Sequence, residues 1–425
     1  MGRKQLKKYD LVVVGGGFAG VAAAVSAERQ GIRVLILEKM NCFGGAASNN
    51  LVLPFMYYTT NMDGKVCRLS RGIFAEITDE LNKNGGMKDS YEFDEEILKL
   101  ILNRMVMKSG ADILFHAQVT DVRQNKDGAL ESLTVFYKGD EYEIHADYFI
   151  DATGDADIAY RCGYPFRLGR EKDQLCQPMT LCFRVDNVDM EAFGQCRGDI
   201  NALYQKFQAE GKIKNPREDV LIFTTMHQKV LHFNSTRIVR KNPTDLFDVT
   251  AAELEAREQV FELFHFLKDN FKCFENARIL STAMEIGVRE SRMIDGEYCI
   301  TADELKDCVR FDDTIAVGNY EIDIHNPEGS GTSHYYFKAG EYYTIPYRAL
   351  LPKNTKNLIV AGRCISVTHE VQASVRIMPI VCTIGQAAGM AAAVAKKQGV
   401  DVGQVNVTEL QNRLIADGAF LGQQE

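Results

Sequence analysis

The sequence contains no C-x-x-C pair, although it has 11 cysteines spread from Cys42 to Cys382. An odd number of scattered cysteines argues against a disulfide framework or a metal knuckle and suits free thiols in a reducing compartment. The four clustered cysteines that an iron-sulfur cluster requires are also missing. We therefore predict a cytoplasmic protein without a metal site.

The chain also lacks an excess of positive charge, because its formal net charge is -9. A nucleic-acid partner requires a basic face that neutralises phosphates. The composition therefore disfavours a nucleic-acid partner, including an RNA substrate. A local basic pocket is still compatible with this net charge.

No repeat, low-complexity tract or long Pro/Ser linker divides the 425 residues, so we expect two closely packed domains. The stretch 377–395 is nearly uncharged, but Pro379, Gln386 and its glycines predict a buried helix rather than a membrane span. The N-terminal stretch superficially resembles a secretory signal. Asp10 and three consecutive glycines instead favour a nucleotide-binding strand, turn and helix.

A glycine fingerprint follows the apolar stretch 11–14. Gly15-x-Gly17-x-x-Gly20 opens a helix, and Glu38 ends the next predicted strand, 21 residues after Gly17. Gly15 suits a tight turn, Gly17 lets a pyrophosphate approach the helix N-terminus, and Gly20 permits close helix-strand packing. A carboxylate at the position of Glu38 accepts hydrogen bonds from a ribose diol and disfavours a 2′-phosphate. The motif therefore predicts FAD or NAD rather than NADP.

The rest of the chain predicts a mixed architecture. Apolar spacing of three and four residues indicates helices over 70–83 and 93–108, and a period of two from residue 111 to 151 indicates an antiparallel meander whose first strand is 113–124. Thr250 and Glu253 form the pattern of a capping box at the start of a long helix. A strand within 357–362 precedes the final apolar helix.

We therefore expect an α/β protein. A Rossmann-like FAD-binding domain, with a parallel sheet plus an antiparallel β-meander, is expected from residues 1–164 and 346–425. A mixed α+β substrate domain is expected as an insertion over 165–345.

Five stretches carry a family resemblance: Gly15 to Glu38, the following "GGAAS", "DATGDAD" at 151–157, "GVRESRMIDGEY" at 287–298, and "AGRCISVTHEVQASVRIMP" with "GQAAGMAAA" at 361–393. No second glycine fingerprint exists, so there is no separate nicotinamide domain. The chain resembles the FAD-dependent oxidoreductase family of glutathione-reductase-type flavoproteins, which is related to heterodisulfide reductase flavin subunits. The resemblance spans nearly the whole chain.

This resemblance implies FAD as the cofactor. It places the pyrophosphate at Gly15, Gly17 and Gly20, the adenosine ribose at Glu38, the adenine at the backbone of Val119, and Asp155 near the ribityl and phosphate region. A turn or capping role for Asp155 is the alternative. The full predicted cofactor set is Gly15, Gly17, Phe18, Ala19, Gly20, Glu38, Lys39, Gly44, Gly45, Ala46, Val119, Thr153, Gly154, Asp155, Gly362, Arg363, Arg376 and Gly385.

The catalytic candidates lie in the last third of the chain. His369, near Glu370 and Arg376, lies in the loop that the resemblance places beside the isoalloxazine, and histidine suits proton transfer near neutral pH. Arg289 and Arg292 are expected to share one face and to clamp an anionic substrate or a flavin carbonyl, with an internal salt-bridge network as the alternative.

Asp323 and His325 are two residues apart on a predicted strand, so their side chains point the same way and can form a pair. A structural polar pair at a strand edge is the alternative reading of these two residues.

The predicted function is transfer of a hydride or electrons between flavin N5 and an unidentified small organic substrate. The electron donor or acceptor is unidentified, and a homo-oligomer is compatible with the sequence. The alternatives are an electron-transfer flavin subunit of a heterodisulfide-reductase-like iron-sulfur complex, and a flavin-binding protein without turnover.

Cys42 precedes the glycine pair Gly44-Gly45, close to where flavin disulfide reductases hold their redox sulfurs. Such enzymes resemble this chain up to the glycine pair and then carry two cysteines a few residues apart. Here the segment 46–50 reads Ala-Ala-Ser-Asn-Asn. A dithiol relay requires two sulfurs within bonding reach, so the sequence favours direct flavin chemistry without a role for Cys42.

Overall fold

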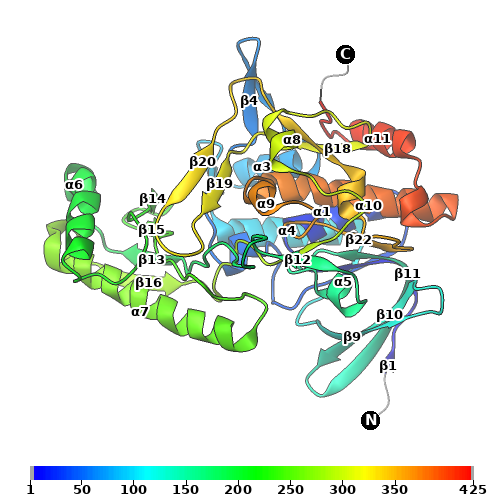
Figure 1. Ribbon diagram of the computed structural model, residues 1–425, viewed down its shortest axis with the longest axis horizontal. Coiled ribbons are helices and arrows are strands. Elements are labelled where there is room, and N and C mark those ends of the chain that lie inside the picture. The colour runs from blue at the N-terminus through cyan, green and yellow to red at the C-terminus, as the bar shows by residue number, and fades with distance from the viewer. Residues whose placement is uncertain (1–3, 423–425) are drawn as a thin grey trace.

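The structure is a computed structural model that describes residues 4–422. Its central sheet contains five parallel strands, in the order β8-β3-β2-β11-β22. They are β2 (Tyr9–Val14), β3 (Val34–Leu37), β8 (Asp112–Leu114), the second half of β11 (Asp140–Asp151) and β22 (Leu358–Val360). Strand β22 comes from the C-terminal part of the chain, so segments from both ends build one sheet (Figure 1).

The first half of β11 belongs to the meander. It pairs antiparallel with β10 (Leu130–Tyr137), which pairs with β9 (Gln118–Gln124), while β1 (Lys4–Gln5) runs parallel to β11. The predicted α/β class with a parallel sheet and a β-meander is confirmed. The expected strand 113–124 is wrong in detail, because the chain turns at His116, where φ is 57°, and splits the stretch between β8 and β9.

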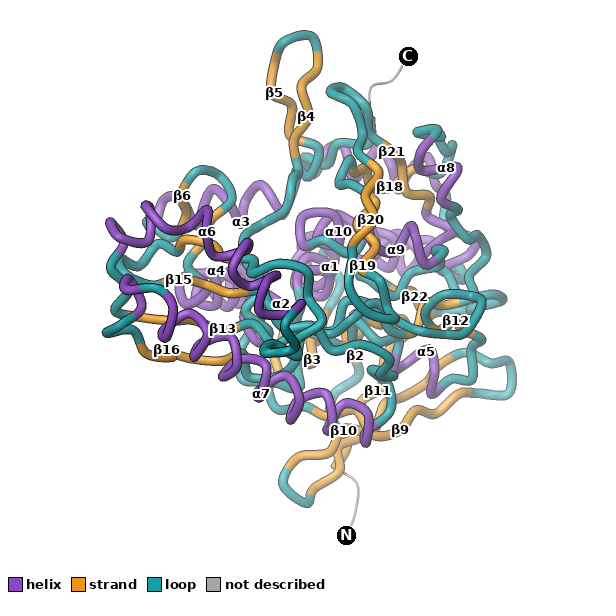
Figure 2. The backbone as a smooth tube through the Cα atoms, turned by 60° about the vertical axis from the view of Figure 1, so that its left-hand side comes forward, coloured by secondary structure: helices purple, strands orange, loops and turns teal. Residues whose placement is uncertain are grey.

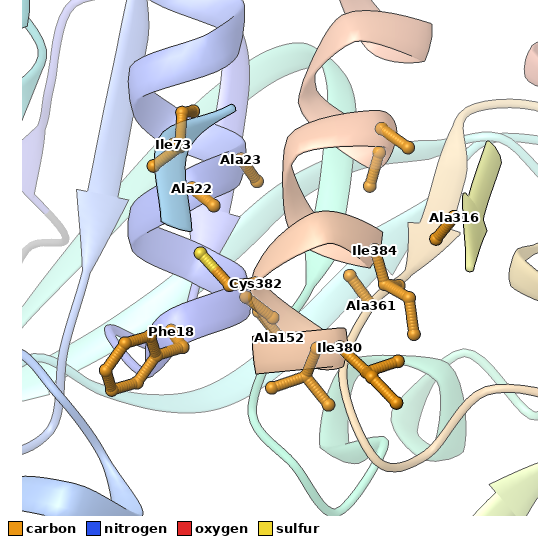
Figure 3. Packing of buried hydrophobic residues seen from close by; sticks show 14 of the residues in the cluster. Phe18, Ala22, Ala23, Ile73, Ala152, Ala316, Ala361, Ile380, Cys382 and Ile384 are labelled. Carbon is orange, nitrogen blue, oxygen red and sulfur yellow. The ribbon is translucent and has the colours of Figure 1, made fainter. Parts of the chain in front are cut away.

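Helices α1 (Phe18–Arg29) and α10 (Met378–Gln398) pack against each other in the core (Figure 3). A Cβ on Gly385 would lie 2.1 Å from Ala19 O, and a Cβ on Gly389 would lie 2.1 Å from Ala23 O. Both positions therefore require glycine for close helix contact. Among the described residues, α10 alone is long and apolar enough to cross a membrane, but its apolar window is entirely buried, as expected.

Other helices cover the sheet or join its strands. The predicted helices at 70–83 and 93–108 are confirmed as α3 (Ile73–Lys83) and α4 (Glu95–Ser109). Asp94 caps α4 by accepting hydrogen bonds from the backbone N–H groups of Glu96 and Ile97. The remaining helices of this part are α2 (Ala46–Asn49), α5 (Asp157–Arg161), α8 (Ala302–Lys306), α9 (His369–Val375) and α11 (Val407–Ala416), with short 3-10 helices η2 (Tyr347–Leu350) and η3 (Val402–Gln404).

A second lobe lies to the left in Figure 1 and again stands beside the main sheet in Figure 2. Its antiparallel sheet has the order β14-β15-β13-β16, made of β13 (Phe183–Asp186), β14 (Ile222–Thr224), β15 (Leu231–Phe233) and β16 (Arg278–Thr282). Helices α6 (Met190–Ala209) and α7 (Leu246–Asn270) and the turn η1 (Lys272–Phe274) complete it. The lobe has its own hydrophobic core, which includes the stacked rings of Phe183 and Phe233.

Helix α7 begins earlier than the sequence predicts. Asp245 is the N-cap, and its side chain accepts hydrogen bonds from the N–H groups of Phe247 and Asp248. Thr250 lies inside the helix and donates its hydroxyl hydrogen bond to Leu246 O, whereas Glu253 accepts from the backbone N–H of Ile286. The expected capping box is therefore wrong, because an exposed apolar first turn at 246–247 conceals the true start.

The inserted region is divided between two cores. Buried residues from Met179 to Ile286, joined by Leu51, form the core of the second lobe. Buried residues from Met293 to Tyr347 instead belong mainly to the core around α1 and α10. We therefore propose that the inserted unit is narrower than the expected 165–345.

Short strand pairs occupy the rest of the described chain. They are β12 (Phe166–Leu168) with β17 (Arg292–Ile294), β18 (Thr314–Gly318) with β21 (Tyr343–Pro346), β19 (Ile322–His325) with β20 (Thr332–Tyr335), β4 (Thr59–Met62) with β5 (Lys65–Arg68), and β6 (Met87–Lys88) with β7 (Glu92–Phe93).

Candidate functional site

Two adjoining cavities lie where the second lobe meets the parallel sheet. The glycine-rich cavity is lined by Gly15 to Gly17, Glu38, Val119 and Asp155, among others. The arginine-rich cavity is lined by Arg217, Arg289, Asp323 and Arg376, with apolar residues around them. Both cavities share Ala46, Asn50, Val288 and Arg363 in their walls, so the two cavities lie next to each other.

Three glycines shape the turn between β2 and α1. Gly15 has φ of 103°, and a Cβ there would lie 2.3 Å from Ala152 O. A Cβ on Gly20 would lie 1.8 Å from Gly15 O, so these two glycines are needed for packing. A Cβ on Gly17 would meet no atom nearer than 3.9 Å, so this glycine leaves space rather than filling it.

The open space at Gly17 faces a helix N-terminus. Gly17 is the N-cap of α1, and no side chain caps the helix or places an acidic group in its first turn. The first N–H groups of a helix need acceptors, and the helix dipole favours an anion there. The geometry therefore fits a pyrophosphate at this end of the glycine-rich cavity.

Glu38 is held in a fixed orientation at the carboxyl end of β3. Its Oε2 accepts a hydrogen bond from Gly16 N at 2.5 Å, and its Oε1 accepts one from Met40 N at 2.8 Å. Burial raises the pKa of Glu38, although the two backbone hydrogen bonds oppose this shift. A carboxylate has about four acceptor sites, so lone pairs are left for a ribose diol.

Asp155 and Arg363 form an ion pair at the junction of the two cavities. Arg363 Nη2 lies 2.6 Å from Asp155 Oδ1, which also accepts a hydrogen bond from Ser291 Oγ at 2.6 Å. Burial alone would raise the pKa of Asp155, but Arg363 and Ser291 outweigh it and lower the pKa. Asp155 is thus an ionised anchor for Arg363 rather than a free turn residue.

The structure brings together about half of the predicted cofactor residues in the glycine-rich cavity. Its walls include Gly15, Gly17, Glu38, Lys39, Gly45, Ala46, Val119, Thr153, Asp155 and Arg363, while Arg376 lines the arginine-rich cavity. Seven others, Phe18, Ala19, Gly20, Gly44, Gly154, Gly362 and Gly385, do not line either cavity. Gly20 and Gly385 have packing roles, and a Cβ on Gly44 would lie 2.0 Å from Ser48 Oγ.

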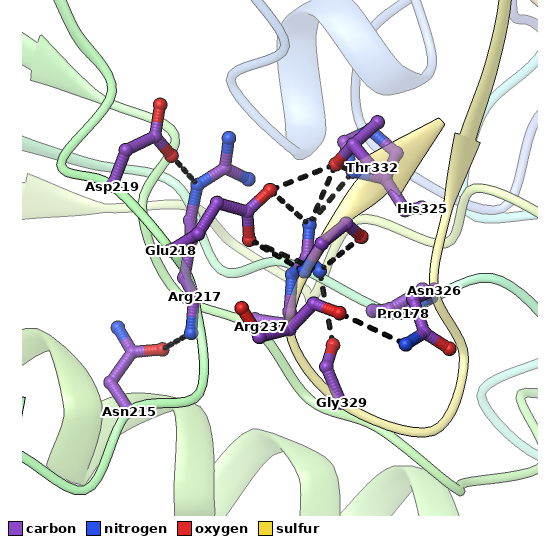
Figure 4. A network of polar contacts seen from close by, with 12 residues as sticks. Pro178, Asn215, Arg217, Glu218, Asp219, Arg237, His325, Asn326, Gly329 and Thr332 are labelled. Carbon is purple, nitrogen blue, oxygen red and sulfur yellow. Dashed lines mark hydrogen bonds and ion pairs between the residues drawn. The ribbon is translucent and has the colours of Figure 1, made fainter. Parts of the chain in front are cut away.

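Asp323 and His325 face the same way from β19, as the spacing predicts. His325 Nε2 lies 3.4 Å from Asp323 Oδ2, and Tyr320 donates its hydroxyl to the same oxygen at 3.2 Å. On the other side of the ring, Arg237 Nη2 lies 3.0 Å from His325 Nδ1 (Figure 4). A guanidinium group only donates, so Nδ1 accepts and the proton of the neutral ring is on Nε2.

The charge states of this pair follow from their surroundings. Burial and the charge of Arg289 lower the pKa of His325 to about 3. Burial alone would raise the pKa of Asp323, but the hydrogen bond from His325 and the charges of Arg376 and Arg289 lower it. His325 is therefore a neutral group that orients an ionised Asp323, rather than a proton donor itself.

Arg289 and Arg376 enter the arginine-rich cavity from different segments. Arg376 follows α9 and its Nη2 lies 3.6 Å from Asp323 Oδ2. Arg289 donates hydrogen bonds to Pro178 O, Thr180 Oγ1 and Asn234 Oδ1. Burial, followed by the charges of Arg376 and Arg217, lowers the pKa of Arg289 to about 9.

Arg292 and His369 are placed elsewhere. The Arg292 guanidinium lies 4.2 Å from the ring centroid of Tyr160 and donates to Asp155 O, so Arg289 and Arg292 do not share a face. Arg292 and His369 line a separate cavity with Tyr160 and Glu370, which we call the His369 cavity. The extended backbone entering β17, in place of a helix, explains why residues three apart diverge.

His369 has a buried partner. Its Nδ1 lies 2.7 Å from Glu290 Oε1, and the Glu290 side chain is fully buried. The sequence expected His369 beside the flavin together with Arg376, but the chain carries the two residues into different cavities. His369 at the start of α9 and Arg376 just beyond its end lie about two helical turns apart.

Sequence reasoning missed Arg217, Asn234 and Tyr320, which line the arginine-rich cavity. Arg217 is held by Asp219, whose Oδ1 accepts from Arg217 Nε at 2.8 Å. The stretch 215–219, Asn-Pro-Arg-Glu-Asp, has a turn composition that gives no signal for a binding site. Only the folded lobe brings it to this cavity.

Cys42 does not line either cavity of the site. The thiol is buried and its Sγ lies 3.6 Å from Asn49 Oδ1. Burial raises the pKa of the Cys42 thiol, which disfavours the reactive thiolate. These observations support the prediction that Cys42 has no redox role.

Comparisons with known proteins identify the family of the chain and relate its fold to solved structures. A family model described as FAD dependent oxidoreductase matches residues 10–414. A digeranylgeranylglycerophospholipid reductase of Methanococcus vannielii is 26% identical over 194 residues, which are 44% of this chain and 49% of that protein. An NADH:fumarate oxidoreductase of Klebsiella pneumoniae (strain 342) is 59% identical over 39 residues, 9% of this chain and 4% of that protein. The chain thus spans about half or less of the length of these relatives.

The fold is similar to that of a solved flavin-dependent brominase. The TM-score is 0.50 at 12% sequence identity, and the alignment covers 96% of this chain and 83% of the brominase. Similarity at this level of identity concerns the fold.

Proposed function

The chain belongs to the FAD dependent oxidoreductase family, and from this premise we propose that the two joined cavities hold one FAD and a small organic substrate. Family membership makes the chain an enzyme that uses FAD. The arrangement of residues along the site is our proposal. The single observation that carries it is that the glycine-rich and arginine-rich cavities adjoin and share Arg363 in their walls.

The glycine-rich cavity suits the adenosine and pyrophosphate. The uncapped N-terminus of α1 beside Gly17 supplies N–H donors for phosphate oxygens. Glu38 keeps acceptor sites for the ribose hydroxyls, and Val119 on β9 lines the wall expected for adenine. Arg363, fixed by Asp155, adds positive charge where the phosphates would lead into the second cavity.

The arginine-rich cavity suits the reactive end. Bound FAD supplies hydride or electron transfer, so the protein must orient the reactants and stabilise charge. Arg376 and the N-terminus of α10, which begins at Met378, both favour negative charge there. Asp323 holds Arg376 in place and accepts hydrogen bonds, while His325 fixes the orientation of Asp323.

The proposal is tested by reconstituting the purified protein with FAD and screening small organic compounds anaerobically for bleaching of the flavin. We expect one compound class to reduce the bound flavin and an added acceptor to reoxidise it. A bound flavin that no substrate or acceptor changes would favour a flavin-binding protein without turnover.

The alternative of an electron-transfer subunit would be favoured instead by iron in the purified protein. The cytoplasmic location and a homo-oligomeric state stay predictions. The electron donor or acceptor is unidentified.

A further inference from the structure

Four arginines line the arginine-rich cavity, and three of them have a carboxylate partner. Arg217 pairs with Asp219 at 2.8 Å, and Arg363 pairs with Asp155 at 2.6 Å. Arg376 lies 3.6 Å from Asp323. Each of these charges is therefore balanced by the protein itself.

Arg289 is different. Its three hydrogen-bond acceptors, Pro178 O, Thr180 Oγ1 and Asn234 Oδ1, are all neutral. Within residues 4–422, no carboxylate lies at ion-pairing distance from its guanidinium group. Arg289 is partly buried, and a charge that is partly removed from water without a direct counter-ion is costly, so native proteins commonly pair such groups. The cavity therefore carries one positive charge that has no ion-pair partner in the described chain.

Asp323 offsets this charge only in part. Its Oδ2 is already engaged by Arg376, by the Nε2–H of His325 and by the hydroxyl of Tyr320. Its Oδ1 lies 3.8 Å from His334 Nδ1. The charges of Asp323 and Arg289 shift each other's pKa through space, but the two side chains form no ion pair among the described residues.

Several donors of the other arginines in this cavity lack an acceptor among the described residues. Arg217 is 5% exposed, and its Nη1 is buried without a hydrogen-bond partner among the described residues. The Nε of Arg376 is also buried without a hydrogen-bond partner among the described residues. Buried donors without acceptors are rare in native proteins and commonly mark a ligand position.

We propose that the substrate carries a single carboxylate, bound by Arg289 with Arg217 beside it. This inference rests on the proposed function and names the substrate class of that site. One positive charge without an ion-pair partner matches a monoanion better than a phosphate dianion, and a planar guanidinium fork matches a planar carboxylate. Leu53, Met56, Leu221 and Phe223 line the same cavity and suit the apolar carbon part of the molecule.

The test uses the FAD-loaded enzyme and three matched pairs of probes: acetate and acetamide, crotonate and crotonamide, and benzoate and benzamide. Binding is measured as a saturable change in the flavin absorption spectrum. We expect at least one carboxylate to bind about 10-fold or more tightly than its amide. Equal affinities within every pair, or no spectral change with any carboxylate, would overturn the proposal.

Variants of Arg289 test whether this residue binds the carboxylate. Arg289→Met should weaken carboxylate binding by about 10- to 100-fold without changing amide binding, and Arg289→Lys should recover part of the loss. Arg278→Met is the matched control, because this arginine is exposed on β16 and pairs with Asp186. If Arg289→Met bound carboxylates as the native enzyme does, Arg289 would not be the anion site.

The midpoint potential of the flavin separates the substrate from the cofactor as the source of negative charge. A lower potential in Arg289→Met, with carboxylate binding intact, would mean that Arg289 serves the flavin, and this would overturn the proposal. Failure to bind FAD at all would instead contradict the proposed function. An enzyme that binds FAD and turns over but does not bind carboxylates would be consistent with the proposed function and would contradict only this inference.

Discussion

The two cavities of the site are built in opposite ways. The glycines and Glu38 of the glycine-rich cavity come from one stretch, residues 14–50, although residues 117–158, 243–253, 285–288 and Arg363 complete its wall. The arginine-rich cavity draws its four arginines and Asp323 from segments spread between residues 217 and 376. The first suits a cofactor that many proteins share, because backbone N–H groups recognise a common pyrophosphate. The second holds the charges that select a substrate. Substitutions in one cavity should therefore impair cofactor binding, and substitutions in the other should impair substrate choice.

The largest effect should come from the arginine-rich cavity. Arg376→Met should lower kcat by about 100- to 1000-fold, because it removes a charge that stabilises the developing negative charge. Binding of FAD should persist, since Arg376 lies outside the glycine-rich cavity. Arg376→Lys should restore part of the rate. Loss of FAD together with activity in Arg376→Met would mean that the two cavities are not separable.

Gly17→Ala tests the other cavity. Gly17 has φ of -69°, and the nearest atom to its added Cβ would be Gly45 Cα at 3.9 Å, an ordinary van der Waals contact, so the fold should tolerate alanine. The methyl group would occupy the space open to the pyrophosphate and weaken FAD binding by about 10- to 100-fold. Calorimetry of the apoprotein and an FAD titration measure the two effects. A lower Tm of the apoprotein with unchanged FAD affinity would assign Gly17 to packing instead.

His369→Ala should affect stability more than catalysis. The change leaves the buried Glu290 without its imidazole partner and should lower the free energy of unfolding by about 1 to 3 kcal/mol. Turnover should change by less than about 3-fold, because a group outside the reactive cavity should supply no transition-state stabilisation. His369→Asn, which keeps a donor, is the control. Loss of turnover in both variants, without a change in stability, would show that His369 has a catalytic role.

Acid should weaken the second lobe through His232. This side chain on β15 is fully buried, and burial lowers its pKa from 6.5 to about 3. Below pH 6.5 the unfolded chain binds a proton that the folded chain does not, so stability is lost as pH falls from 6.5 toward 3. His232 contributes at most about 1.4 kcal/mol per pH unit. Between about pH 7 and about pH 5, the free energy of unfolding measured with denaturant should therefore fall less in His232→Leu than in the native protein. Equal losses in the two proteins would show that His232 does not cause the acid sensitivity.

The smallest effect is expected at Cys42. Cys42→Ser should leave FAD affinity and kcat within about 2-fold, because the thiol lines neither cavity and substitutions away from a functional site change its chemistry little. A rate assay with the substrate found by screening measures this. A large loss of turnover would reinstate a thiol relay.

The same contrast explains what the sequence could predict. Gly15, Gly17, Gly20 and Glu38 lie within one strand-turn-helix-strand unit, so their spacing alone predicts their places in the fold. The parallel sheet and the meander follow from local periodicity in the same way. Long-range placement has no such signal, and Arg217 was missed because only the folded second lobe brings it to the cavity.

Asp323 and His325 are an intermediate case. Their spacing on a strand predicts that they share a face, and the structure confirms it. The position of the proton on His325 Nε2 depends on Arg237, which lies 88 residues earlier in the chain and donates to Nδ1. Two other predicted groupings are not found in the structure. Helix α9 separates His369 from Arg376, and the extended backbone before β17 separates Arg289 from Arg292, although each pair is close in sequence.

The most direct test is a crystal structure of the FAD-loaded protein. The account predicts the pyrophosphate at Gly17 and the N-terminus of α1, the ribose at Glu38, and the isoalloxazine in the arginine-rich cavity beside Arg376. An isoalloxazine ring in the His369 cavity, or a dinucleotide that does not contact Gly17, would contradict it.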